Sequence, residues 1–151
     1  RERVGHAPVI LPGIMAVIRD EAGRVLAARR RDDDLFDVPG GYCDLGETTT
    51  AAAIREVREE TGLIIQPERV IGVYSQDMLY TYPNGDVVHG VGLALACRVT
   101  GGHLRADHTE ISEVAFLAPG ELLAQGAPPG MAGMQQLWQD LAYPDRWPVL
   151  R

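Results

Sequence analysis

The chain has 151 residues, 46% of them apolar, and a formal net charge of −7 at pH 7, which predicts a single globular domain over residues 1–151 with a sizeable core. The acidic charge argues against polymeric nucleic acid as a partner, because such binding relies on clustered Lys and Arg. No apolar run is long enough to span a membrane, and the two cysteines, Cys43 and Cys97, are too few for a disulfide framework, which favours a cytoplasmic setting.

The N-terminal part of the chain is predicted to hold an arm and a β-hairpin. Residues 1–12 contain two prolines among mixed residue types, so we expect a lead-in arm there. The run Gly13–Asp20 is typical of a strand, and Arg24–Arg29 is expected to return beside it as the second strand of a hairpin. Farther along, Gly40 and Gly41 permit unusual backbone dihedrals and close backbone approach.

A helix is predicted after these glycines. Thr48, Thr49 or Thr50 can cap its start, and Ala51–Glu60 are mostly good helix formers. Gly62 stands where a helix commonly ends in a left-handed residue. Apolar and small side chains recur at helical spacing and are expected to pack against a sheet. They are Ala53, Ile54, Val57 and Thr61.

Three carboxylates follow one another closely on this predicted helix. Glu56, Glu59 and Glu60 are three and four positions apart, and an α-helix therefore places them on one face. Like charges in this arrangement repel and destabilise the helix unless a cation lies between them. Carboxylate oxygens are the ligands that Mg²⁺ and Mn²⁺ prefer. The spacing therefore predicts a site for a hard divalent metal, Mg²⁺ or Mn²⁺.

The second half of the chain is predicted to be rich in strands. Arg69–Tyr82 and Val87–Val99 are expected to be strands on either side of a turn, and Glu113–Leu117 a further short strand. A single helical turn at Glu121–Gln125 and an amphipathic helix at Met131–Leu141 are expected to close the chain. Strands and helices mix without regular βαβ alternation, so we expect an α/β fold in which a mixed β-sheet carries helices on both faces.

The segment from Gly41 to Leu63 reads GYCDLGETTTAAAIREVREETGL. It resembles, at every defined position, the signature of the Nudix (MutT-like) hydrolase family, G-x5-E-x7-R-E-U-x-E-E-x-G-U with U apolar. An ordinary solvated acidic helix would account for the charges, but not for Glu47, Arg55 and Gly62 at these intervals. The resemblance implies the Nudix α/β/α sandwich, with its mixed β-sheet between helices.

The resemblance also implies a set of metal ligands. Glu56, Glu59 and Glu60 are the expected carboxylate ligands. A backbone carbonyl of Gly41 or Gly40 is expected to join them. The implied cofactor is Mg²⁺ or Mn²⁺.

Two further groups are implied by the resemblance. Glu47 and Arg55 are expected to form an ion pair that supports the helix and the loop, with direct metal ligation by Glu47 as the alternative. Glu59 is the first candidate for the general base. Glu110 resembles a late acidic residue that some members use as a ligand or base, although an exposed loop carboxylate is the other interpretation; Glu113 is its neighbour to test. The predicted catalytic set is Glu59, Glu56, Glu60, Arg55 and Glu110.

The family resemblance implies a metal-dependent pyrophosphohydrolase that cleaves a phosphoanhydride in a nucleoside diphosphate derivative, with a nucleotide sugar such as ADP-ribose as one candidate. The alternatives are a MutT-type pyrophosphatase of (oxidised) nucleoside triphosphates and a Nudix domain that senses a nucleotide without cleaving it. The intact acidic positions argue against the sensor. We expect a small phosphorylated nucleotide as the partner, no polymeric nucleic acid, no membrane, and a monomer or homodimer.

Several side chains are weaker candidates for substrate contact. The cluster Arg29–Arg31 could approach phosphates, but the end of a charged hairpin is more often simply solvated. Aromatic residues could stack on a base or ribose, but core or edge packing is the commoner role of such residues in strands. They are Phe36, Tyr74, Tyr80 and Tyr82.

Overall fold

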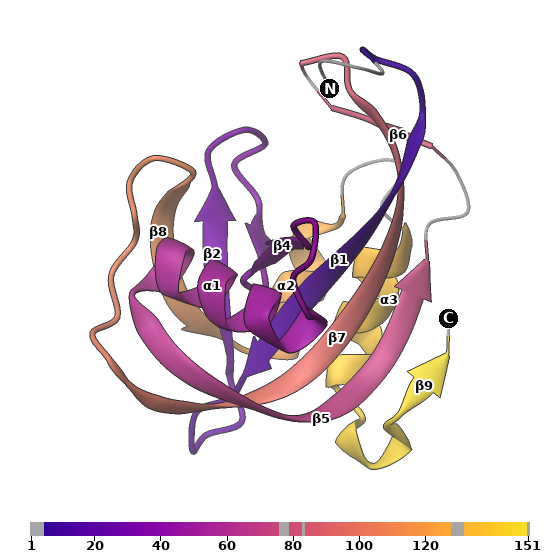
Figure 1. Cartoon of the computed structure of the whole chain (residues 1–151). Coiled ribbons are helices and arrows are strands. Elements are labelled where there is room, and N and C mark those ends of the chain that lie inside the picture. The colour runs from indigo at the N-terminus through magenta and orange to yellow at the C-terminus, as the bar shows by residue number, and fades with distance from the viewer. Residues whose placement is uncertain (1–4, 76–78, 83, 128–131, 151) are drawn as a thin grey trace.

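The computed structural model describes residues 5–75, 79–82, 84–127 and 132–150 (Figure 1). Within these ranges, none of the helices is long and apolar enough to cross a membrane. The elements, in chain order, are β1 (Val9–Ile18), β2 (Val25–Arg30), β3 (Phe36–Asp37), β4 (Gly40–Tyr42), α1 (Thr49–Thr61), β5 (Leu63–Ser75), β6 (Tyr80–Thr81), β7 (Val87–Gly102), β8 (Ile111–Leu117), α2 (Pro119–Gln125), α3 (Ala132–Leu141), the 3₁₀ turn η1 (Pro144–Arg146) and β9 (Val149–Leu150).

The strands of the described chain form two sheets. The larger has the order β4-β1-β7-β5-β9, with β6 paired to β7, and the smaller has the order β3-β2-β8. In the larger sheet β1 runs parallel to β7, whereas β4 and β5 are antiparallel to their neighbours β1 and β7. The predicted mixed sheet is therefore confirmed.

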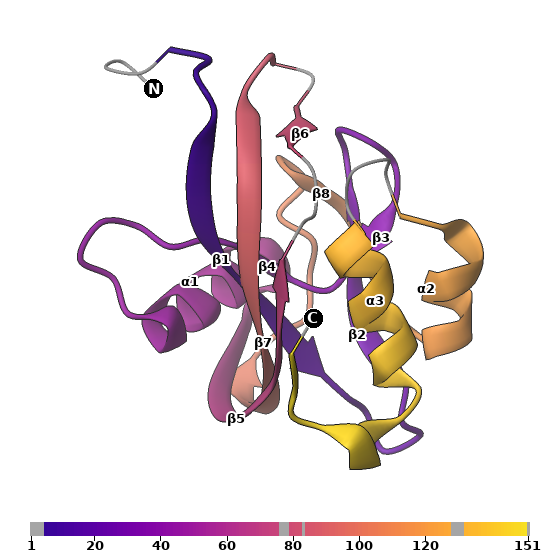
Figure 2. The ribbon, with the colours of Figure 1, turned by 90° about the vertical axis from the view of Figure 1, so that its right-hand side faces the viewer.

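Helices cover both faces of the larger sheet. Figure 1 shows α1 in front of this sheet and α3 behind it, and the turned view in Figure 2 places α1 on one side and α2 and α3 on the other. On the first face Ala53 and Val57 of α1 are fully buried in one core cluster, and on the second face Leu137 and Trp138 of α3 are fully buried in another. The predicted α/β arrangement, with helices on both faces, is confirmed.

The predicted caps hold α1 in place. Thr48 is its N-cap, and the Thr48 hydroxyl accepts a hydrogen bond from the Ala51 amide (3.2 Å). Gly62 ends the helix at a φ of 70°, and a Cβ atom at this position would lie 2.6 Å from the His103 carbonyl oxygen. Only glycine therefore suits this end of the helix, where the next chain segment packs closely.

One residue of the predicted buried face of α1 is misplaced. Ile54 is 39% exposed, whereas Ala52 is fully buried. Ala53, Val57 and Thr61 are each four positions apart and form the buried stripe, so Ile54 lies about 100° around the helix axis from that stripe. The prediction for Ile54 was wrong because it counted the residue beside the stripe as part of it.

The structure corrects the predicted arm, because β1 begins at Val9 and pairs with β7 from there. Residues 9–12 of the predicted arm are therefore strand, and residues 1–4 lie outside the described chain. Pro12 is tolerated because its carbonyl accepts from the Cys43 amide (3.0 Å) on the edge opposite β7. The N–H and C=O of a strand residue point to the same side, so the missing N–H of Pro12 removes no bond to β7.

The predicted N-terminal hairpin forms only at its turn. Arg19 and Val25 make an isolated antiparallel bridge, and beyond it β1 and β2 enter different sheets. The sequence signal for the turn was sound, since Asp20 accepts hydrogen bonds from the amides of Ala22 and Arg24. The partner of β2 is instead β8, far along the chain, which local patterning does not reveal.

The later elements extend beyond their predicted bounds. β5 begins at Leu63 rather than Arg69, because register shifts on both sides of Pro67 let the strand continue through that residue. β9 was not predicted, since a two-residue strand carries no periodic pattern; it pairs with Gly72 and Val73 of β5. The closing helix is described from Ala132, and Met131, with which its predicted range begins, lies outside the described chain.

Candidate functional site

A cavity of about 350 Å³ opens between the two sheets, α1 and α3. Its lining comes from β1, β2, β3, β4, α1, β5, β7, β8 and α3, so residues distant in the sequence meet in it. Glu56 and Glu60 of α1 and Glu110 beside β8 line it together with Gly40 and Gly41. The structure thus collects most of the predicted site residues at one place.

Gly40 and Gly41 let the backbone of β4 approach its neighbours closely. A Cβ atom on Gly40 would lie 2.1 Å from the Ile14 carbonyl oxygen of β1, and a Cβ atom on Gly41 would lie 2.4 Å from Glu56 Oε1. Gly40 therefore permits the pairing of β4 with β1, where it lies opposite Met15. Gly41 permits the Glu56 carboxylate to lie directly against the backbone.

Glu60 is the most buried carboxylate of the site, with 8% of its surface exposed. The Gly40 amide donates a hydrogen bond to Glu60 Oε2 at 3.0 Å. Burial raises the pKa of Glu60 to about 8; repulsion from Glu56 and Asp37 adds to this rise, and the Gly40 amide opposes it. Without a cation beside it, Glu60 therefore holds a proton near neutral pH.

Glu56 lies beside Glu60 and has a cationic partner. Its side chain is 16% exposed, and Arg55 Nη1 donates to Glu56 Oε1 at 2.8 Å. Burial raises the pKa of Glu56, the hydrogen bond and charge of Arg55 oppose the rise, and repulsion from Glu59 and Glu110 adds to it. Two neighbouring carboxyls with raised pKa values thus face the cavity.

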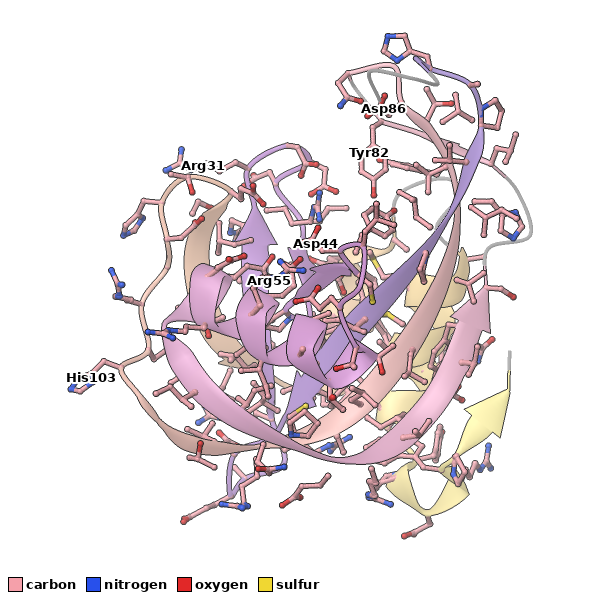
Figure 3. All side chains as sticks on the ribbon, viewed as in Figure 1. Arg31, Asp44, Arg55, Tyr82, Asp86 and His103 are labelled. Carbon is pink, nitrogen blue, oxygen red and sulfur yellow. The ribbon has the colours of Figure 1, made fainter. Side chains whose placement is uncertain are left out.

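Arg55 and Glu47 form the predicted ion pair. Arg55 Nε and Nη2 donate to the two oxygens of Glu47 at 3.0 and 2.9 Å, and Nη2 also donates to the Tyr42 carbonyl at 3.1 Å. The hydrogen bonds from Arg55 and from the Asp44 amide lower the pKa of Glu47 to about 2. This bidentate pair ties the motif loop to α1, as a supporting role requires. Figure 3 shows Arg55 on α1 near Asp44 of the same loop, whose carboxylate lies 3.9 Å from Arg55 Nε.

Glu59 does not line the cavity. Its side chain is 61% exposed and accepts a hydrogen bond from Arg55 Nη1 at 3.3 Å. The hydrogen bond from Arg55 thus keeps the Glu59 side chain at the rim, outside the cavity lining. The hydrogen bond from the Gly40 amide keeps the Glu60 side chain inside the cavity. Consistent with this separation, the described part of the chain contains no ready-assembled group of three His, Cys, Asp or Glu side chains around a metal position. The role of Glu59 remains a prediction.

Glu110 reaches the cavity from a tight turn. Asp107 Oδ1 accepts hydrogen bonds from the amides of Thr109 (3.1 Å), Glu110 (3.2 Å) and Ile111 (2.8 Å). This turn places Glu110 in the cavity lining, together with Glu56 and Glu60 of α1. Glu113, its proposed neighbour, is instead bound to Arg29 on β2 at 3.1 Å. Of the two late carboxylates, the structure therefore brings only Glu110 to the site.

The three arginines at the end of β2 and directly after it differ in whether they line the cavity. Arg30 lines the cavity, and its guanidinium donates two hydrogen bonds to Asp32, at 3.0 and 2.6 Å. Arg31 lines a neighbouring hollow. Arg29 lines neither, because it packs over the Phe36 ring and pairs with Glu113. Arg30 and Arg31 are thus placed to contact a ligand and Arg29 is not.

Aromatic side chains form part of the cavity wall. The Tyr82 hydroxyl lies 2.8 Å from the Tyr42 hydroxyl, and the Tyr80 ring packs edge-on against Tyr82 with 4.7 Å between ring centroids. Figure 3 shows Tyr82 pointing toward the side of the molecule where Asp44 and Arg55 lie. Of the aromatic candidates from the sequence, Tyr74 and Tyr82 line the cavity, whereas Tyr80 supports Tyr82 from behind.

Sequence reasoning missed Asp37, which lines the cavity on β3. Burial raises the pKa of this carboxyl to about 6, and hydrogen bonding by the Val38 amide opposes the rise. Its only sequence signal is its place just before the Pro39-Gly40-Gly41 turn. That place did not reveal burial, because burial depends on residues from elsewhere in the chain, among them Ala28 of β2 and Trp138 of α3.

The donor set of the cavity fits a hard divalent cation. Glu56 and Glu60 supply two neighbouring carboxylates, and the backbone of Gly40 and Gly41 lies against them. Burial and mutual repulsion disfavour the ionised forms of both carboxyls, which a bound cation would reverse. Oxygen-rich sets of this kind suit Mg²⁺ or Mn²⁺.

Residues 10–137 match the family described as "NUDIX domain". The chain is 34% identical over 110 residues to a Bacillus subtilis protein named "Putative 8-oxo-dGTP diphosphatase", which covers 73% of this chain and 68% of that protein. It is 33% identical over 116 residues to a "MutT-like protein" of Streptomyces ambofaciens (76% and 68% covered). An "ADP-ribose pyrophosphatase" of Methanocaldococcus jannaschii is 33% identical over 104 residues (67% and 56% covered).

Solved structures share the fold at lower identity. A UDP-X diphosphatase superposes with a TM-score of 0.71 at 18% identity, covering 95% of this chain and 68% of that one. A MutT protein from Methanosarcina mazei Go1 superposes with a TM-score of 0.70 at 20% identity, covering 93% and 98%. The arrangement of sheets and helices is therefore common to these proteins and this chain.

Proposed function

The chain belongs to the Nudix family and is a pyrophosphohydrolase that acts on phosphoanhydrides; from this premise, we propose that it cleaves a nucleotide whose phosphates lie over Glu56 and Glu60 and whose nucleoside enters the cavity. The observation that carries this proposal is the lining of one cavity by two kinds of group. Carboxylates and glycine backbone make up part of the lining, and aromatic and apolar side chains make up much of the rest. A nucleotide has the same division into a charged and a ring-bearing half.

Glu56 and Glu60, with the Gly40 or Gly41 backbone, would hold Mg²⁺ or Mn²⁺, which supplies charge neutralisation at the phosphates and a water of lowered pKa. Arg55 orients Glu56 through its 2.8 Å hydrogen bond and is itself anchored by Glu47. This is the positioning that catalysis by charged groups requires.

Two carboxylates are candidates for the general base. Glu110 faces the cavity from the β8 side, where a carboxylate could accept a proton from an attacking water. Glu59 lies at the rim in contact with Arg55, and a side-chain rotation would be needed to bring it inward. We favour Glu110 because it already lines the cavity.

Two substrate classes are supported by the relatives. The name of the Bacillus subtilis protein favours a nucleoside triphosphate, including an oxidised one, and that of the Methanocaldococcus jannaschii protein favours ADP-ribose. We place the triphosphate first, since the Bacillus subtilis relative is covered over 68% of its length, against 56% for the Methanocaldococcus jannaschii relative.

A substrate panel tests the proposal. GTP, dGTP, 8-oxo-dGTP, ATP and ADP-ribose are incubated with Mg²⁺ or Mn²⁺ in ¹⁸O-labelled water, and the products are identified by mass spectrometry. We expect metal-dependent cleavage of at least one of them, with the label showing which phosphorus was attacked. Glu56→Gln is the inactive control, and Glu113→Gln, which changes a carboxylate outside the cavity, should leave the rate unchanged. Failure to cleave any member would contradict the proposal.

A further inference from the structure

The side chain of Gln125 completes the edge of a strand that leads into the cavity. Gln125 is the last residue of α2 and lies 89 positions along the chain from its partner, Phe36 of β3. Its Oε1 accepts a hydrogen bond from the Phe36 amide at 2.9 Å, and its Nε2 donates to the Phe36 carbonyl oxygen. One side chain therefore makes both of the hydrogen bonds that a neighbouring strand would make to this residue.

The outer edge of β3 is where these two bonds are needed. β3 is two residues long and is the end strand of the order β3-β2-β8. On the inner side, the Leu35 carbonyl accepts a hydrogen bond from the Arg30 amide of β2 at 2.9 Å. Successive strand residues direct their N–H and C=O groups to opposite sides, so those of Phe36 point away from β2. Because Phe36 is buried, its backbone groups require partners from the protein, and Gln125 supplies them.

The segment that follows this edge leads directly to the carboxylates of the cavity. Gly40 lies three positions beyond the end of β3 and lines the cavity, and its amide donates to Glu60 Oε2 at 3.0 Å. At this far end β4 pairs with β1, and the Ala16 amide donates to the Pro39 carbonyl at 2.8 Å. The backbone between β3 and β4 is thus anchored by β1 at one end and by β2 and Gln125 at the other.

Gln125 acts on the cavity from outside it. It is not among the described residues that line the cavity, and α2 lies on the side of the larger sheet away from α1 (Figure 2). Leu122 of the same helix is fully buried, so α2 gives the Gln125 side chain a fixed base. A carboxamide offers one acceptor and one donor without a charge, which is the pair that the edge of a strand requires.

We propose that Gln125 is a positioning residue of the hydrolase: by closing the edge of β3 it holds the segment that ends at Gly40, and so keeps Glu60 oriented for metal binding. Groups that orient a metal ligand typically contribute about 10–100-fold to metal affinity or activity. Gln125 acts through the backbone, so its effect is smaller, about fivefold. The inference rests on the proposed function, since it takes Glu56 and Glu60 to hold the metal.

Amide hydrogen exchange, followed by NMR on metal-free protein, tests the positioning directly. Gln125→Met keeps a similar helix propensity but can make neither hydrogen bond. We expect the Phe36 and Gly40 amides to exchange at least about tenfold faster in this variant, because the loss of the edge bonds loosens the whole segment. Gln139→Met is the matched control, since it makes the same change at an exposed position of α3 and should alter neither amide.

Metal binding and turnover give the functional readout. Titration with Mn²⁺ in the absence of nucleotide, followed by electron paramagnetic resonance, should show about fivefold weaker binding by Gln125→Met. With the best substrate of the panel, kcat should fall by a similar factor, while KM changes by less than about twofold because Gln125 does not line the cavity. Faster exchange at Phe36 with unchanged exchange at Gly40, Mn²⁺ affinity and kcat would overturn the inference and leave Gln125 a purely structural role.

Two further outcomes concern the unaltered protein. A Phe36 amide that exchanges as fast as an exposed amide would overturn the inference, and this measurement does not depend on whether Gln125→Met folds. Cleavage of no nucleotide would refute the proposed function instead, while exchange at Gly40 and the Mn²⁺ titration would still decide the role of Gln125.

Discussion

The two walls of the cavity are built in opposite ways. The wall formed by the motif comes from one contiguous segment, 41–63, and Arg55 links its charges by hydrogen bonds to Glu47, Glu56 and Glu59. The facing wall takes single residues from β1, β3, β5, β7 and α3, among which Asp37 is the charged group. The difference indicates that the predicted carboxylate ligands come from one segment, while the rest of the lining is assembled from many.

The carboxylates in and around the cavity also differ in how their charges are compensated. In the motif loop, outside the cavity lining, Glu47 is paired with Arg55, and its pKa falls to about 2. Deeper in the cavity Glu60 and Asp37 lack ion pairs of short range, and their pKa values rise to about 8 and about 6. The paired charges support the fold, and the unpaired charges are the ones available to a cation or ligand.

The largest expected effect separates Glu60 from Glu59. Glu60→Gln should lower kcat/KM by about 100-fold or more, because it removes a carboxylate held inside the cavity. Glu59→Gln should have a smaller effect, since Glu59 lies at the rim. Steady-state kinetics with Mg²⁺ on the best substrate of the panel measure both variants. A larger loss for Glu59→Gln would show that its side chain moves inward in the working enzyme.

A backbone change at Gly40, directly before the motif segment, should have the next largest effect. Gly40→Ala places a Cβ atom 2.1 Å from the Ile14 carbonyl oxygen, so the pairing of β4 with β1 must shift. We expect a loss of about 2–4 kcal/mol in the free energy of unfolding, measured by urea denaturation. Gly120→Ala in α2 is the control; its Cβ atom meets nothing within 4 Å, so stability should stay the same or rise slightly. Equal stability of the two variants would contradict the close-packing argument.

The unpaired carboxyls predict a dependence of stability on pH in metal-free protein. Asp37 and Glu60 titrate at about 6 and 8 when folded, above the 3.8 and 4.5 of unfolded carboxyls. Between these values the folded chain binds more protons, so the free energy of unfolding falls, by roughly several kcal/mol, as pH rises from about 4.5 to 8. Glu47, with its lowered pKa, acts oppositely and loses its contribution only as pH falls below about 4.5.

Mg²⁺ should reverse this trend, since a cation bound only to the folded state stabilises it and favours ionised carboxylates. Urea denaturation with EDTA and with Mg²⁺, at pH 5 and pH 8, measures the effect, and the gain from Mg²⁺ should be larger at pH 8. Glu60→Gln should flatten the EDTA profile. A metal-free protein more stable at pH 8 than at pH 5 would count against buried, unpaired carboxyls.

The smallest expected effect is that of removing the Tyr82 hydroxyl, which contacts the Tyr42 hydroxyl of the motif segment. Tyr82→Phe removes the hydroxyl that lies 2.8 Å from Tyr42, in a partly exposed position. We expect a loss of about 0.5–1.5 kcal/mol in unfolding free energy and a change in KM of no more than about threefold. Tyr143→Phe, at an exposed position away from the cavity, serves as the control. A loss of activity above about tenfold would instead assign the Tyr82 hydroxyl a direct contact with the reacting phosphates.

Much of the motif wall could be predicted from the chain alone. The caps at Thr48 and Gly62, the helix between them and the pairing of Glu47 with Arg55 all depend on residues within 23 positions of one another. Helical period and capping chemistry act over that range, so local sequence is sufficient to specify them. The same reasoning failed for Ile54, which sits one position beyond the buried stripe.

The amino-acid sequence by itself indicated the family, the helix that carries the carboxylates and the predicted site for a hard cation, because these follow from the spacing and chemistry of neighbouring residues. Only the tertiary structure decided that Glu60 lies inside and Glu59 at the rim, since that choice depends on the Gly40 amide and on Arg55. Only the tertiary structure brought Asp37 to the cavity, because its burial is produced by strands and a helix that come from distant parts of the chain.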